Sequence, residues 1–100
     1  MSNPKEIKSL FIEARTWFDK TGGTSYFSAR IEADGKLIGR LPFQYGYGNQ
    51  YEYEATKWLL DNGYLSERIE PLWRLRDKGV AVYSVIYETN KRDAQRWGQD

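Results

Sequence analysis

The sequence predicts one α+β domain over residues 1–100: a three-stranded antiparallel sheet with helices packed on one face, in the order α-β-β-α-α-β. Three observations predict it. An amphipathic segment opens the chain, a hairpin with an Asp34-Gly35 turn follows, and a β-branched and aromatic run lies near the end. A length of 100 residues suits one domain with its own hydrophobic core.

The first element is predicted to be a helix over residues 4–20. Asn3-Pro4 has the form of an N-cap followed by proline at the first helical position. Apolar residues then recur at helical spacing, at Ile7, Leu10, Phe11, Ala14, Trp17 and Phe18. Gly22-Gly23 would end this helix, because glycine readily takes the left-handed conformation of a C-cap.

A β-hairpin is predicted next, with a first strand from Thr24 to Ala33 and a return strand from Lys36 to about Phe43. Side chains alternate along the first strand, and Asp34-Gly35 is typical of a two-residue turn. Pro42 cannot donate a backbone hydrogen bond, so the return strand frays there or lies at an edge. An open edge at this strand could pair with a second copy, which leaves monomer and homodimer both open.

The second half is predicted to contain two helical segments and a third strand. The loop QYGYGN (residues 44–49) leads into a helix over residues 51–62, which Asn62-Gly63 closes. A further helical turn starts near Ser66, restarts at Pro71 and stops at Gly79. Residues 80–89 form the third strand, and the polar tail after it forms a last helical turn or frays.

The composition argues against most catalytic chemistry. The chain has no Cys and no His, so it lacks thiolate nucleophiles, the usual neutral-pH base and the commonest metal ligand. Gly46-x-Gly48 lacks the remaining residues of a phosphate-binding loop. We therefore expect no enzyme, cofactor or metal site, with a small carboxylate-only enzyme as the alternative. No signal peptide or membrane-spanning segment is evident, so a soluble, cytoplasmic protein is expected.

Binding is the function that the composition favours. Aromatic residues make up 16% of the chain, eight of them Tyr, while the net charge of +1 argues against nonspecific binding of polyanions. Tyr and Arg are enriched at binding hot spots. One group of candidates lies on the sheet face predicted to be open, namely Tyr26, Ser28, Arg30 and Arg40. The other group lies in or beside the QYGYGN loop, which is either a structural latch or a binding surface, namely Tyr45, Tyr47, Asn49 and Tyr53.

The stretch from residue 24 to residue 65 combines a Ser-x-Arg strand, a turn, and a Tyr-Gly-Tyr-Gly-Asn loop before a Tyr-rich helix start. The residues that carry this pattern are Ser28, Arg30, Tyr45, Gly46, Tyr47, Gly48, Asn49 and Tyr51. The pattern resembles a class of small, mostly uncharacterised bacteriophage-encoded proteins. This resemblance implies a phage accessory protein that binds and modulates a host protein in the bacterial cytoplasm, such as an inhibitor of CRISPR effectors or restriction enzymes. The alternative is a nucleic-acid- or nucleotide-binding module that uses the Tyr/Arg sheet face.

Overall fold

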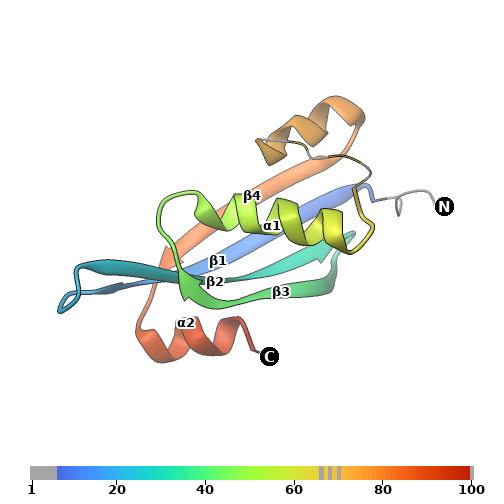
Figure 1. Ribbon diagram of the computed structural model, residues 1–100. Helices are drawn as coiled ribbons and strands as arrows, with labels where there is room; N and C mark the ends of the chain where they lie inside the picture. The colour runs from blue at the N-terminus through green and yellow to red at the C-terminus, as the bar shows by residue number, and fades with distance from the viewer. Residues whose placement is uncertain (1–6, 66, 68, 70, 100) are drawn as a thin grey trace.

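The computed structural model describes residues 7–65, 67, 69 and 71–99, and within them four strands form one mixed sheet in the order β3-β2-β1-β4 (Figure 1). The strands are β1 (Ser9–Asp19), β2 (Thr24–Ala33), β3 (Lys36–Tyr45) and β4 (Ala81–Glu88). The helical elements are α1 (Gln50–Asp61), the 3₁₀ helix η1 (Leu72–Lys78) and α2 (Lys91–Trp97). β1 pairs antiparallel with β2 and parallel with β4, and β2 pairs antiparallel with β3.

The predicted fold class is wrong, and the first element is the main reason. Most of the segment predicted as a helix over residues 4–20 is the strand β1, while residues 4–6 of that prediction lie outside the described residues. Leu10, Ile12 and Ala14 alternate along β1 and are fully buried. Leu10, Ala14 and Trp17 also fit a helical repeat, so the apolar pattern suits both structures. The sheet is therefore four-stranded and mixed, not three-stranded and antiparallel.

The helices lie on both faces of the sheet, which corrects the prediction that they cover only one. Figure 1 shows α1 and α2 on opposite faces. Leu72 and Leu75 of η1 join the same buried cluster as α1, so η1 belongs to the α1 side. We call this side the core face and the opposite side the α2 face. α2 packs against β1, β2 and β3.

The predicted hairpin is confirmed in β2 and β3, and its turn is tied to β1. Asp34 and Gly35 both have positive φ, 53° and 80°, as the predicted turn requires. The Asp34 carboxylate accepts hydrogen bonds from the backbone N–H groups of Lys8 (2.8 Å) and Ser9 (2.9 Å). These backbone donors hold the pKa of the Asp34 carboxyl below its ordinary value of 3.8. The turn thereby fixes the start of the neighbouring strand.

The core lies between the sheet and α1. Its sheet side includes the buried residues Phe27, Ile31, Leu41 and Val82, and Ala55 and Leu59 of α1 are fully buried against them. Gly39 of β3 lets α1 approach very closely. A Cβ atom at this position would lie 2.1 Å from Cζ2 of Trp58. The Trp58 ring of α1 therefore packs directly on the backbone of β3.

Candidate functional site

Two of the predicted binding residues are engaged with α2. Ser28 is fully buried, and its hydroxyl donates a hydrogen bond to the carbonyl of Ala94. The Arg30 guanidinium lies 3.8 Å from the centroid of the Trp97 ring, and its Nε donates to the Trp97 carbonyl at 3.1 Å. The middle of the sheet face that was predicted to be open is therefore covered by the C-terminal helix.

Trp97 contacts a second arginine. The Arg15 guanidinium also lies over the ring, at 4.0 Å from its centroid, and Arg15 pairs with Glu13 at 2.7 Å. The indole Nε1 donates to the Glu13 carbonyl at 2.6 Å. Aromatic rings attract cations over their faces, and an indole N–H gains from a buried acceptor. These contacts fix α2 on the sheet, and Arg15 was missed because the sequence placed it on a helix.

Tyr26 belongs to an aromatic stack that crosses three strands. Its ring centroid lies 5.8 Å from that of Trp17 and 5.3 Å from that of Phe43, and the Tyr45 ring stands edge-on to it at 6.2 Å. Tyr26 is half-buried, while Tyr45 is 62% exposed. Arg40 lies opposite Arg30 in the pairing of β3 with β2, and its buried Nε has no hydrogen-bond partner among the described residues.

The QYGYGN loop combines a latch with an exposed ring. The N–H of Gly46 donates to the Ser25 carbonyl at 3.1 Å, and a Cβ at Gly46 would lie 2.6 Å from the Phe27 ring. Only glycine fits this approach. The next residue, Tyr47, is 70% exposed, and Asn49 is exposed just before α1. Gly46 thus acts as the structural latch, while its neighbour Tyr47 is exposed at the surface. Tyr53 lies apart from this loop, on α1.

An open groove lies on the core face, near the turn between β1 and β2. At this end of the sheet, the β1–β2 hairpin extends past α1 (Figure 1). The groove has a volume of about 370 Å³, and we call it the end groove. Its lining comes from both halves of the chain and comprises Thr16, Phe18, Ser25, Tyr47, Gly48, Ile86 and Glu88. Phe18 is 54% exposed and Ile86 is 39% exposed. Of the predicted site residues, only Tyr47 lines it.

The end groove continues around the end of β4. A second open hollow shares Thr16, Phe18 and Glu88 with it and adds Lys20 and Asn90, among others. Its shape follows from the strand lengths, because the β1–β4 pairing ends at Thr16 and Glu88 while β1 runs on to Asp19. The sequence analysis missed Phe18 because it assigned this residue to the apolar stripe of a helix, and it assigned Ile86 to the third strand without singling it out.

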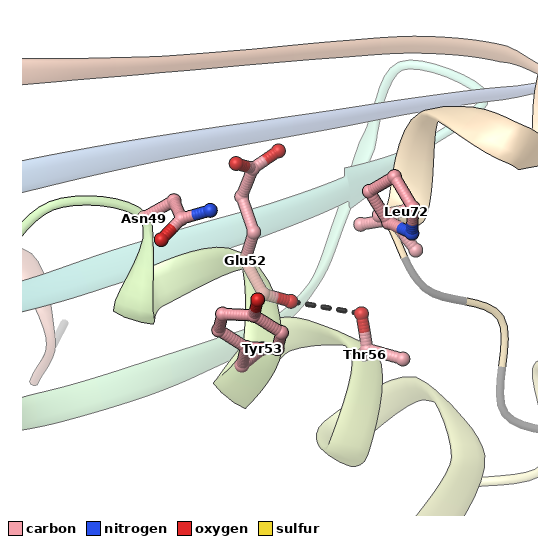
Figure 2. Close-up of a pocket in the computed structure, with 6 residues that line it drawn as sticks. Asn49, Glu52, Tyr53, Thr56 and Leu72 are labelled. Carbon is pink, nitrogen blue, oxygen red and sulfur yellow. Dashed lines mark hydrogen bonds between the residues drawn. The ribbon is translucent and has the colours of Figure 1, made fainter.

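The hollow between α1 and η1 is much smaller (Figure 2). It encloses about 20 Å³, roughly the room that one water molecule needs. Figure 2 shows the Thr56 hydroxyl bonded to the backbone carbonyl of Glu52, at 2.8 Å, while the Glu52 carboxylate extends towards the sheet. That carboxylate accepts a hydrogen bond from the hydroxyl of Ser84 at 3.1 Å. This hollow has no room for a substrate.

The described residues contain no group of three or more carboxylate, Cys or His side chains that could hold a metal ion. In the same part of the chain, no helix has the length and hydropathy needed to cross a membrane. Comparison with known protein families, curated proteins and solved structures finds no match to this chain. The resemblance of residues 24–65 to phage proteins therefore stays a prediction, and the function has to be argued from the surface.

Proposed function

We propose that this chain is a protein-binding module without catalytic activity of its own, and that the end groove is its binding surface. The observation that carries the proposal is the exposure of three apolar side chains around one groove. Phe18, Tyr47 and Ile86 are 54%, 70% and 39% exposed. Clustered apolar groups facing water favour association, and aromatic residues are typical anchors of interfaces.

The position of the groove supports the same function. Its residues stand on paired strands and on a loop that Gly46 fixes to β2, so the surface is held rigid before a partner arrives. A preorganised surface loses less conformational entropy on binding. Nucleic-acid binding through Tyr26, Arg30 and Arg40 has less support, because α2 covers the middle of that face.

The class of partner follows from the resemblance stated above. A phage accessory protein acts in a bacterial host, so the proposed partner is a host protein and the proposed role is to modulate it. Inhibition of a defence complex is the specific form of this proposal.

A capture experiment tests the proposal. The wild-type chain is immobilised and exposed to bacterial lysate, and Tyr47→Ala and Phe18→Ser are compared with Trp73→Ala, which removes a half-exposed ring from η1. We expect a stoichiometric protein partner whose affinity falls about 30-fold or more in the first two variants, as for hot-spot residues, and stays unchanged in the third. Thermal denaturation confirms that each variant is folded. Equal capture by all four proteins would contradict the proposal, and capture of labelled RNA or DNA with a strong salt dependence would favour the alternative.

A further inference from the structure

The free edge of β4 suggests how such a partner binds. Resting on the proposed protein-binding function, we infer that the partner adds an extended segment to β4 as a fifth, antiparallel strand, and that this segment carries Lys or Arg on either side of an apolar residue. Among the described residues, the sheet order β3-β2-β1-β4 gives β4 one neighbour, so its other edge faces outwards. Addition of a strand to such an edge is a common mode of peptide recognition.

The unpaired backbone groups of this edge can be assigned. The N–H of Ala81 donates to Lys8 at 2.9 Å and the N–H of Thr89 donates to Thr16 at 2.8 Å, both towards β1. Because backbone groups alternate along a strand, residues at even positions turn their N–H and C=O outwards. Arg76 Nη2 already donates to the Val82 carbonyl at 2.6 Å. The remaining outward residues are Ser84, Ile86 and Glu88, and an antiparallel strand bonds twice with each of them.

The two edges of the sheet differ in their protection. The outer strand β3 carries Lys36 and Pro42, and its pairing with β2 has two register shifts. Lysine, proline and bulges are the usual devices that prevent strand addition. β4 has the sequence AVYSVIYE, without Lys or Pro, and its pairing with β1 runs without interruption from Ser9–Ala81 to Thr16–Glu88. The β3 edge is therefore protected against strand addition, while the β4 edge is left able to pair from Ser84 to Glu88.

Negative charge along the β4 edge favours a partner segment that carries basic residues. The three free residues direct their side chains to the core face, where Glu52 accepts the Ser84 hydroxyl bond and Glu88 is exposed. Neither carboxylate takes part in an ion pair with another described residue. A residue of the added strand opposite Ser84 or Glu88 meets a carboxylate, and one opposite Ile86 meets that apolar side chain at the edge of the end groove. The matching order is basic, any, apolar, any, basic.

A second copy of this chain is a poorer occupant of the same edge. Antiparallel self-pairing of the three free residues is centred on Ile86. It sets Glu88 of each copy opposite Ser84 of the other, beside Glu52. Like charges opposed across strands are destabilising, and the two-fold axis repeats the conflict. The edge is thus suited to a basic segment and unsuited to itself.

Fluorescent peptides test the inference directly. The probe is Thr-Lys-Val-Ile-Val-Lys-Thr, compared with the same peptide in which both Lys are Glu. A third peptide is N-methylated at the central Ile, whose N–H must face β4, and its matched control is N-methylated at the first Val, whose N–H faces away. We expect the basic peptide to bind with a Kd below about 1 mM. The acidic peptide and the Ile-methylated peptide should each bind at least about tenfold more weakly, and the Val-methylated control should bind as the parent does.

Protein variants complete the test. Glu52→Gln and Glu88→Gln should each weaken binding of the basic peptide about threefold. Glu54→Gln, on the same helix as Glu52, should leave the affinity for this peptide unchanged. No binding of the basic peptide, equal binding of the acidic one, or indifference to N-methylation at Ile overturns the inference. A concentration-dependent dimer in sedimentation that Ile86→Lys abolishes also overturns it. These results concern only the strand edge. If Tyr47→Ala still loses the partner captured from lysate, the proposed function stands, because that function depends on the end groove and not on the edge of β4.

Discussion

Replacement of Trp97 by Ala tests whether α2 is an integral part of the fold. The indole donates a hydrogen bond to the Glu13 carbonyl, and the Arg15 and Arg30 guanidinium groups lie over its ring at 4.0 and 3.8 Å from the centroid. The hydrogen bond contributes about 1 kcal/mol, the two cation–π contacts together about 1 kcal/mol, and partial burial of the ring a further 1 kcal/mol or so. We therefore expect Trp97→Ala to lower the free energy of unfolding by about 3 kcal/mol.

Urea denaturation followed by circular dichroism measures this change. In a domain of this size, about 3 kcal/mol corresponds to a fall in Tm of about 12–24 °C. Trp97→Phe keeps an aromatic ring beside the arginines but removes the N–H group. Its loss of unfolding free energy should therefore be smaller, about 1 kcal/mol. Trp73→Ala, at a ring that is 50% exposed, is the control and should change stability by less than about 1 kcal/mol. A Trp97→Ala loss no larger than that of the control would refute the role assigned to α2.

Three further predictions concern the remaining supports of the fold. Gly39→Ala should destabilise the protein by about 1–3 kcal/mol in urea denaturation, because the new Cβ lies 2.1 Å from a Trp58 ring atom and the core must shift. Because the pKa of Asp34 is lowered in the folded state, its carboxylate stabilises the fold at pH values above its ordinary pKa of 3.8. This stabilisation is lost as the pH falls through the lower pKa of the folded state. Denaturation from about pH 5 to about pH 2 should therefore show a loss of stability that is smaller in Asp34→Asn; equal slopes would contradict this. Burial raises the pKa of the Tyr51 hydroxyl above 10.0. Its contribution to the free energy of unfolding is therefore present below pH 10.0 and lost as the pH rises through the folded-state pKa. Ultraviolet titration should show one phenolate forming late, and this late step should be missing in Tyr51→Phe.

The sequence predicted the elements that have one clear periodicity. β2 and β3 show alternation and a turn with positive φ, and α1 shows a helical repeat closed by Asn62-Gly63. β1 was mistaken because it is a central strand covered on both faces. Apolar residues therefore occupy Phe11 and Trp17 as well as the alternating core positions, which hides the period of two. The regular alternation of Leu10, Ile12 and Ala14 was the signal that could have identified it.

The candidate surface was predicted only in part, for a related reason. Tyr47 was singled out because glycines flank it in a loop, and local sequence is sufficient for that inference. The contacts of Ser28 and Arg30 with α2 depend on the C-terminal segment of the chain, which contains few apolar residues. Ala94 and Trp97 are the two that dock, and no local pattern says where a seven-residue helix will lie. The end groove needs β4 to lie beside β1, and that parallel neighbour follows from tertiary structure alone.

The parallel pairing of β1 with β4 also has a consequence for synthesis on the ribosome. β1 meets its hairpin partner β2 soon after both have been made, but Ser9 cannot pair with Ala81 until most of the chain has emerged. During that interval the inner edge of β1, with its row of β-forming side chains, has no neighbour on one side. A nascent chain stalled before β4 would thus be the form most prone to aggregate, and the last third of the sequence is what closes the sheet.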